Sequence, residues 1–340
     1  MPQIICNFTP KLKKNLSMID KKKDRPFVFV RCMTFNHEAY IKDTLNGFVI
    51  QQTTFPFVVA IINDASTDNT KSVINDFVKN NCIYNHEIDL RTEDYGTVLD
   101  VIVKDNPHCI FHIVHLNENH YGKKSKLPYF AKYENAAKYV AMCEGDDYWT
   151  DPLKLQKQVD FLEANLEYSM CFHKVNVISH DKNDNDLYSH LQEKEYTASE
   201  IYEKWTVPTC SVVYRKSNLN LRKPKTMIFG DIVLFLSLAE GGKVSCMDFN
   251  GGVYRRLTSG SSSKYSNDTL RKLYHQYQEM ITLFPEVRDI SIKNRNEYLG
   301  YIIYDKAFKG TWKYRLHYMW LNKQLLFSRF ALATIKYLFV

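Results

Sequence analysis

Val-Ala-Met-Cys-Glu-Gly-Asp-Asp-Tyr-Trp, residues 140–149, is the stretch that decides the fold of this chain. Its apolar start is short enough for a buried strand, and the run stops abruptly at Glu144, Gly145, Asp146 and Asp147. Ligands of α/β proteins bind beyond the carboxyl ends of strands. Two carboxylates roughly 4 Å apart repel by about 4 kcal/mol at an effective dielectric of about 20, and a divalent cation reverses that repulsion. The stretch therefore predicts a metal-binding strand end; the alternative is a solvated acidic turn that binds nothing.

Two earlier stretches show the same order of strand, polar turn and helix. The first has a strand at 27–32, the turn 34–38 and a helix at 39–51, and the second has a strand at 57–62 followed by the turn 63–70. Capping explains part of these polar turns, but the second turn has more carboxylates and hydroxyls than one cap uses, which leaves Asp64 without a structural task. Two consecutive βα units predict a parallel sheet with a nucleotide-sized crevice. No G-x-G-x-x-G or G-x-x-x-x-G-K-[ST] occurs, which argues against a dinucleotide fold and a P-loop NTPase.

Composition narrows the class of protein. The chain has 340 residues and a net charge of +7, with its basic residues gathered towards both ends, a distribution that favours a membrane surface or an anionic ligand over nucleic acid. Its eight cysteines form no C-x-x-C pair, which is typical of a reducing compartment. No apolar run is long enough for a secretion signal or a membrane span. We expect a cytoplasmic protein, either soluble or peripheral on the cytoplasmic face of the membrane.

The remaining stretches carry weaker predictions. We expect a helix at 97–104 and a strand at 110–115, followed by a loop whose lysines either meet a phosphate or stay solvated. Asp231 precedes an apolar helix at 232–239, where it either caps the helix or is aimed into a crevice. Arg255 and Arg256 precede a Ser-rich loop, 257–263, that is either a mobile lid on an anion or a connector.

The last residues, 311–340, combine aromatic and basic side chains without an acidic one. This composition is typical of a helix at a membrane interface, and a tertiary or oligomer contact would look similar. The predicted organisation is a basic leader at 1–25, an α/β domain at 26–263 and a helical C-terminal region at 264–340.

Taken together, these elements resemble a family 2 glycosyltransferase with the GT-A fold, a Rossmann-like, mostly parallel sheet flanked by helices. The resemblance runs from about residue 27 to 263 and rests on three motifs in order: Thr34-Phe35-Asn36-His37-Glu38, Asn63-Asp64-Ala65-Ser66-Thr67-Asp68 and Glu144-Gly145-Asp146-Asp147-Tyr148-Trp149. The chain departs from the family pattern at Asn63 and Ala65, where Asp and Gly are usual, at Glu144, the first acid of D-x-D, and at Leu257, often His. Q-x-x-R-W is absent, which argues against a processive polysaccharide synthase.

The resemblance implies roles for individual residues. It implies that a nucleotide-sugar is bound by Thr34, Asn36, Glu38, Asp64, Ser66, Lys123, Glu144, Gly145, Asp146 and Arg255. It places Mg²⁺ or Mn²⁺ on the diphosphate through Asp146 and Asp147, and it makes Asp231 the general base.

The implied reaction is an inverting transfer of sugar from a nucleotide-sugar, with UDP as the expected nucleotide, to a hydroxyl of a glycan or lipid-linked acceptor. Two alternatives stay open. A nucleotidyltransferase would make the nucleotide-sugar, although the turn 34–38 lacks the glycine and lysine of its phosphate loop. A membrane-associated scaffold of the same fold would have lost activity. The sugar, the linkage and the oligomeric state are not fixed by the sequence.

Overall fold

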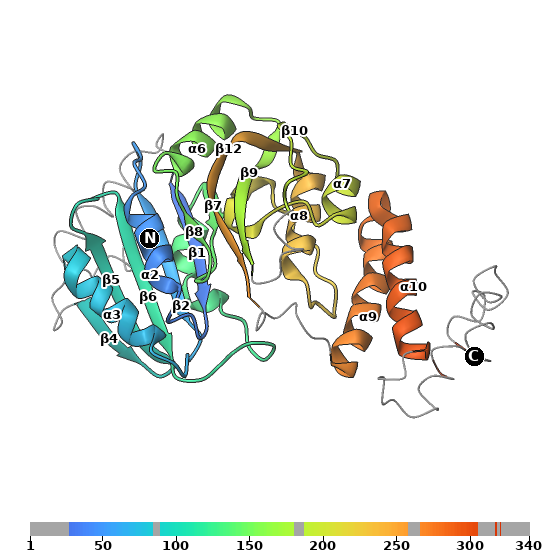
Figure 1. Ribbon diagram of the computed structural model, residues 1–340, viewed down its shortest axis with the longest axis horizontal. Coiled ribbons are helices and arrows are strands. Elements are labelled where there is room, and N and C mark those ends of the chain that lie inside the picture. The colour runs from blue at the N-terminus through green and yellow to red at the C-terminus, as the bar shows by residue number, and fades with distance from the viewer. Residues whose placement is uncertain are drawn as a thin grey trace. The chain divides into compact units, whose positions relative to one another are not determined.

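The structure, a computed structural model, describes residues 27–83, 89–179, 187–257 and 266–304, together with 317 and 320 (Figure 1). The predicted basic leader at 1–25, most of the Ser-rich loop and nearly all of the aromatic and basic tail at 311–340 lie outside these residues.

A single sheet of twelve strands organises the described part of the chain (Figure 1). The strands are β1 (Val28–Thr34), β2 (Phe57–Asn63), β3 (Cys82–Ile83), β4 (Leu90–Glu93), β5 (Gly96–Val103), β6 (Cys109–Leu116), β7 (Tyr139–Met142), β8 (Tyr148–Trp149), β9 (Tyr168–Ser179), β10 (Lys194–Glu195), β11 (Val213–Arg215) and β12 (Lys243–Arg256). Their order is β10-β12-β9-β11-β7-β1-β2-β6-β5-β3, with β4 paired to β5 and β8 to β12.

The centre of this sheet is parallel. β7, β1, β2 and β6 are neighbours that run in the same direction, while β11 and β5 join them antiparallel on either side. The carboxyl ends of the four central strands therefore share one edge. The predicted fold class, an α/β sheet flanked by helices, is confirmed, with parallel pairing limited to this centre and to β9 with β12.

Alternation along the central strands builds the core. Every second residue of β1 and β2, such as Val30 and Val59, is buried in one cluster with apolar residues of three helices. These helices are α2 (Ile41–Val49), α3 (Thr70–Asn81) and α6 (Lys154–Ala164). The residues in between face the other side, where Phe29 of β1 stacks on Phe130, which immediately precedes the short helix α5 (Ala131–Ala136).

The helix expected at 97–104 is wrong, because these residues form β5. Seven of its eight positions are paired with β6, from Gly96 opposite Leu116 to Ile102 opposite Ile110. The Val and Ile residues of this stretch suit a pleated, buried surface, and pairing with the neighbouring strand overrides the helical spacing.

The chain divides into two compact units. The first comprises Met1–Thr197, Thr206–Leu219 and Leu238–Arg256, and the second comprises Ala198–Trp205, Asn220–Ser237 and Leu257–Val340. The sheet belongs to the first. The second contains α7 (Ala198–Glu203), the first turns of α8 (Gly230–Gly241), α9 (Asn267–Leu283) and α10 (Arg288–Tyr304). Tyr274 of α9 is buried with Leu299 and Ile302 of α10, so these two helices share an apolar core of their own.

None of the helices in the described residues has the length and the hydropathy that crossing a lipid bilayer requires.

A lysine is buried in the core of the first unit. Lys154 of α6 is fully buried, its Nζ has no hydrogen-bond partner in the described structure, and the amine lies 3.9 Å from the centre of the Trp149 ring. Burial lowers the pKa of Lys154 to about 7. The ring face offsets only part of the cost of burying the charge.

We therefore expect Lys154→Met to stabilise the protein in a pH-dependent way. An unfolded lysine titrates near pH 10.4, so the unfolded chain binds more protons than the folded one between about pH 7 and 10, and folded stability rises across that window. At pH 6.5 the variant should gain about 1–3 kcal/mol in the free energy of unfolding, and the gain should shrink towards pH 10. Urea titrations at several pH values measure this, and a gain that does not change with pH would contradict it.

Candidate active site

The polar turns that follow β1, β2 and β7 meet at the shared carboxyl edge of the sheet. Thr34, the last residue of β1, is paired with Asn63, the last of β2. The backbone N–H of Gly145 donates to the Met33 carbonyl over 2.9 Å, and the Glu144 carboxylate accepts the Met33 N–H over 3.1 Å. The acidic turn 144–147 is thereby fixed beside the end of β1, and the structure brings together the sequence-predicted residues of all three motifs.

Three of these residues bind the neighbouring turn. Ser66 Oγ accepts the N–H of Asn36 over 2.9 Å, and Asn36 Oδ1 accepts the N–H of Thr67 over 2.8 Å. Glu38 Oε2 accepts the N–H of Asn69 over 2.7 Å. Asn36, Glu38 and Ser66 were predicted to line a nucleotide pocket, and the contacts described here give them the additional task of joining the turns after β1 and β2.

These two turns contain left-handed backbone. Asn36 and Ala65 both have φ of 56°, a conformation that asparagine tolerates and that costs alanine roughly 1 kcal/mol or more. Ala65 stands where the family pattern has glycine, so its φ gives the physical reason for that glycine.

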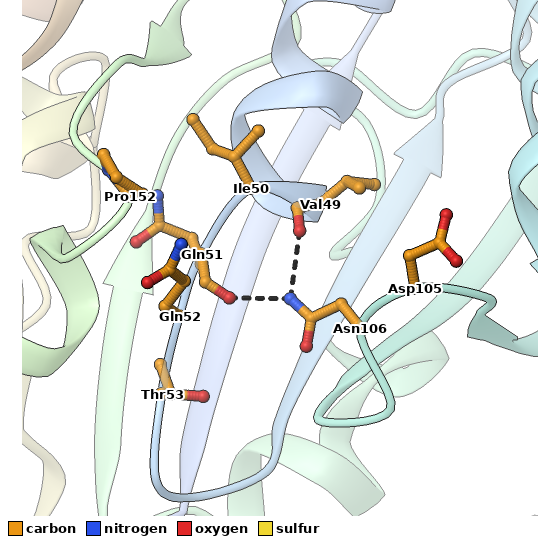
Figure 2. A pocket seen from close by; sticks show the side chains of 8 residues that line it. All are labelled: Val49, Ile50, Gln51, Gln52, Thr53, Asp105, Asn106 and Pro152. Atoms are coloured by element: carbon orange, nitrogen blue, oxygen red, sulfur yellow. Dashed lines mark hydrogen bonds between the residues drawn. The ribbon is translucent and has the colours of Figure 1, made fainter.

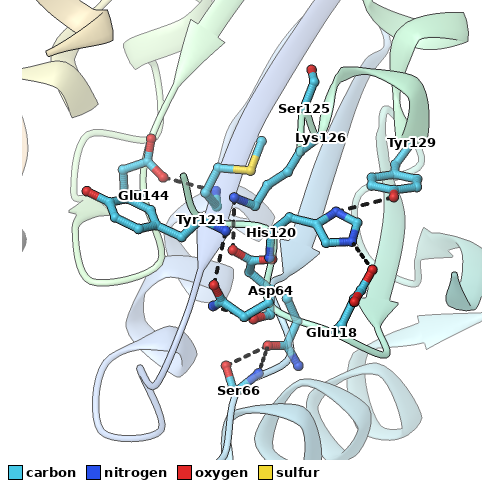
Figure 3. A network of polar contacts seen from close by, with 12 residues as sticks. Asp64, Ser66, Glu118, His120, Tyr121, Ser125, Lys126, Tyr129 and Glu144 are labelled. Atoms are coloured by element: carbon cyan, nitrogen blue, oxygen red, sulfur yellow. Dashed lines mark hydrogen bonds and ion pairs between the residues drawn. The ribbon is translucent and has the colours of Figure 1, made fainter. Parts of the chain in front are cut away.

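Asp64 lies at the centre of a polar network that only the structure reveals (Figure 3). Its carboxylate is nearly buried; Oδ1 accepts the backbone N–H of His120 over 2.8 Å, and Oδ2 pairs with Lys126 Nζ at 2.8 Å. Among the lysines of this loop, Lys123 was the one expected to bind the nucleotide-sugar. Lys123 is exposed, and Lys126 is the residue that meets Asp64. The sequence offered no means of separating them except that Lys126 precedes a Leu-Pro turn.

The two aspartates of the acidic turn have different environments. Asp147 is buried and accepts the N–H of Arg255 over 2.7 Å, and burial, followed by the charge of Asp146, raises its pKa well above the usual range. The side chain of Asp146 is 23% exposed, and its Oδ2 lies 3.9 Å from His37 Nε2. Burial lowers the pKa of His37, which favours the neutral ring beside this carboxylate.

Gly145 permits a close approach between the acidic turn and the end of β1. A Cβ at this position would lie 2.5 Å from Thr34 Oγ1 and 2.9 Å from His37 Nδ1. Both atoms are buried and make no hydrogen bond in the described residues. A side chain at Gly145 would therefore push the acidic turn away from β1.

Arg255 supports the acidic turn. Its guanidinium lies 5.2 Å from the Tyr40 ring centre and 4.4 Å from that of Tyr148, and Nη1 donates to the Asp146 carbonyl over 2.8 Å. Nη2 pairs with Asp43 at 2.5 Å. Arg255 was expected to contact the nucleotide-sugar, and these contacts occupy much of its guanidinium.

Asp231 lies in the second unit, in the first turn of α8. Its Oδ1 accepts the N–H of Ile232 over 2.9 Å, and burial raises its pKa. The fully buried Gln276 of α9 holds the backbone just before this turn. It accepts the N–H groups of Ile228 and Phe229 over 2.6 and 3.1 Å, and it donates to the Phe229 carbonyl over 3.1 Å.

The described residues contain no group of three His, Cys, Asp or Glu side chains spaced to hold a metal ion. Mg²⁺ is commonly bound through one or two carboxylates together with substrate phosphates, so a complete protein cage is not required. The partly exposed Asp146 carboxylate fits a cation that arrives with a diphosphate.

A hollow of about 590 Å³ lies at the opposite edge of the sheet (Figure 2). It is lined by residues 49–53, 105, 106 and 152. The Asn106 amide donates to the carbonyls of Val49 and Gln51 over 3.0 and 2.6 Å, which fixes the wall. Because its lining is made mainly of aliphatic and amide side chains with Asp105 as its one carboxylate, we do not assign the reaction to it.

Comparison with known proteins shows relatives over most of the chain. The Mycobacterium tuberculosis protein Rv1520 is 32% identical over 231 residues, 67% of this chain and 58% of its own length. The chain thus spans less than two thirds of that relative. TuaG of Bacillus subtilis, provisionally named a teichuronic acid biosynthesis glycosyltransferase, is 23% identical over 75% of this chain and 89% of its own.

A solved structure has the same fold. Staphylococcus aureus TarS in complex with UDP-GlcNAc superposes with a TM-score of 0.54 at 17% identity, covering 84% of this chain and 75% of the other. The sequence pattern of the family named glycosyl transferase family 2 matches residues 32–221, more than half of the chain. Together with the three turns at one edge of an α/β sheet, this match shows that the chain belongs to glycosyl transferase family 2.

Proposed function

We propose that this protein is an inverting glycosyltransferase that moves a sugar from a UDP-sugar to a hydroxyl of a glycan or lipid-linked acceptor. The observation that carries the proposal is the placement of Asp64 with Lys126, and of Asp146, around the carboxyl edge of a family 2 sheet. The family and the UDP-GlcNAc complex of TarS support it. The provisional name of TuaG supports a surface-polysaccharide acceptor.

The pair of Asp64 and Lys126 suits the edge of uracil. A carboxylate accepts the N3–H of the base and an ammonium donates to O4. Cytosine presents the reverse pattern at these positions, with an acceptor at N3 and an amino donor at C4, so its edge leaves both charged groups poorly matched. Guanine resembles uracil along this edge but is a larger base.

Asp146 would hold Mg²⁺ or Mn²⁺ together with the diphosphate. Asp147 was expected to be a second metal ligand; because it is buried and accepts the Arg255 N–H, its proposed role is instead to fix the turn. When bound, the cation supplies positive charge that stabilises the departing UDP.

Asp231 is the proposed general base. It takes the proton of the acceptor hydroxyl, whose oxygen forms the new bond to the anomeric carbon while the bond from that carbon to the UDP oxygen breaks. The raised pKa of Asp231 supports this role, since a carboxylate that is a stronger base removes a proton more readily.

A panel of nucleotide-sugars tests the function directly. The purified protein should release UDP from at least one UDP-sugar in the presence of Mn²⁺ and a crude glycan acceptor, and should make no nucleotide-sugar from a sugar phosphate and UTP. Formation of nucleotide-sugar would identify a nucleotidyltransferase. Binding of UDP without any turnover would identify an inactive scaffold.

The base assignment has its own test. Lys126→Ala removes the donor to O4 and leaves Asp64 without its cation, so UDP should bind about tenfold or more weakly, as expected for a hydrogen bond to a charged group. Lys124→Ala is the matched control, because Lys124 lies on the same loop and pairs with the exposed Glu118. Calorimetry with UDP and Mn²⁺ measures the UDP affinity of both variants, and equal affinities would reject the role of Lys126.

A further inference from the structure

A buried carboxylate lies on the face of the sheet that α5 covers, outside the residues assigned above. Asp100 of β5 has a side chain that is 1% exposed. Its oxygens contact Arg91 at 2.5 Å, His112 Nδ1 at 2.7 Å and the Tyr133 hydroxyl at 2.7 Å, and Lys132 lies 4.0 Å away. Burial alone would raise the pKa of Asp100, but the hydrogen bond from His112 and the charges of His112, Lys132 and Arg91 hold it well below its usual range. Asp100 is therefore a fixed negative charge inside the protein.

His112 connects this charge to the loop that forms one wall of the proposed base site. It lies directly opposite Asp100 on β6, and its side chain is 2% exposed. Nδ1 faces the Asp100 carboxylate, and Nε2 faces the carbonyl of Tyr129 at 2.8 Å. Each ring nitrogen therefore faces an acceptor, and the imidazole bridges the Asp100 carboxylate and the Tyr129 carbonyl.

Tyr129 in turn holds the segment that carries Lys126. The Tyr129 N–H donates to the Lys126 carbonyl over 3.1 Å, at the start of the short 3₁₀ turn Leu127–Tyr129. The Tyr129 hydroxyl lies 3.3 Å from His120 Nδ1, and the His120 N–H donates to Asp64 (Figure 3). A continuous series of direct contacts through His112 and Tyr129 thus connects Asp100 to the pair of Asp64 and Lys126.

We propose that His112, held by Asp100, is a positioning residue for nucleotide recognition: it anchors the 120–129 segment to the sheet so that Lys126 and Asp64 together present the edge that selects uracil. This inference rests on the proposed function, because it assigns a task to that nucleotide site. His112 does not touch the nucleotide. It fixes where the ammonium of Lys126 lies relative to the carboxylate of Asp64, and hence how well O4 and N3–H are matched at the same time.

The test measures selectivity, which a purely structural role would leave unchanged. The dissociation constants of UDP and CDP are measured with Mn²⁺ by calorimetry for the full chain, for His112→Phe and for Asp100→Asn. We expect the parent to bind UDP at least about tenfold more tightly than CDP. Both variants should reduce this ratio of affinities to about threefold or less, mainly because they bind UDP more weakly. A general loss of stability would weaken the binding of UDP and of CDP by the same factor, and would leave the ratio of the two dissociation constants at the parent value.

Tyr139→Phe is the matched control. The buried Tyr139 hydroxyl links Arg215 and Glu163 in a separate polar network of the same unit, so the variant loses buried hydrogen bonds without touching the 120–129 segment. It should keep the parent ratio. Asp100→Asn keeps the shape of the side chain, and its ratio decides the question if His112→Phe does not fold; a parent-like ratio in either folded variant overturns the inference. A parent protein that binds neither nucleotide refutes the proposed function instead, before the role of His112 is at issue.

Discussion

Asp231→Asn should lower kcat for sugar transfer by at least about a hundredfold while leaving the affinity for UDP close to that of the parent. A general base contributes roughly 10²- to 10⁴-fold in rate, and asparagine keeps the shape of the side chain but accepts no proton at neutral pH. Donor binding should persist because the proposed UDP contacts are made by Asp64, Lys126 and Asp146. Steady-state kinetics with UDP release as the readout measures kcat, and calorimetry measures the affinity.

The pH dependence gives an independent check on the same residue. Burial raises the pKa of Asp231, so the acid limb of kcat in the parent should lie above the ordinary range of an aspartate, and activity should fall as pH drops through it. Asp268→Asn is the control, since Asp268 is an exposed acid in the first turn of α9, where it pairs with Lys272. Turnover of Asp231→Asn within about tenfold of the parent would remove Asp231 from the role of base.

Asp146→Asn should abolish the dependence of UDP binding on Mn²⁺. The amide carries no charge, so a cation bridging this position and the diphosphate loses its protein anion, and we expect UDP affinity in Mn²⁺ to fall by about a hundredfold, towards its value in EDTA. Calorimetric titrations of UDP with and without Mn²⁺ measure the difference. Retained stimulation by Mn²⁺ would show that the cation is bound elsewhere.

Variants of two other aspartates distinguish a loss of metal binding from a general loss of stability. Asp105→Asn changes an acid at the opposite edge of the sheet, beside the hollow of Figure 2, and Mn²⁺ should raise the UDP affinity of this variant as much as that of the parent. Asp147→Asn tests whether the buried acid acts through structure, because its carboxylate accepts the Arg255 N–H that fixes the turn. We expect that variant to lose stability and UDP affinity together, with the remaining affinity still raised by Mn²⁺.

Patterns formed by neighbouring residues predicted their own structure correctly. An apolar run that ends in acids marks a strand end whether or not its partners are known, so β7 and the turn 144–147 were placed correctly. The same holds for the strands β1 and β2 and the turns that follow them.

The expected helix at 97–104 shows where such reasoning is wrong. Val98, Val101 and Ile102 have the i, i+3, i+4 spacing of a helix, but these residues form a strand because β6 lies along β5 in the folded chain. Pairing with a distant segment is not encoded in the stretch itself.

What the sequence by itself determined is therefore the family, the α/β class and the acids that come to the carboxyl edge, because strand direction and strand ends follow from local periodicity. The tertiary structure alone decided that Lys126 and not Lys123 meets Asp64, that Asp147 is buried while Asp146 is partly exposed, and that His112 joins Asp100 to Tyr129. Each of these features depends on contacts between residues that are far apart in the chain. Burial and the distance to other charges, which only the folded chain sets, determine how readily such a group is charged.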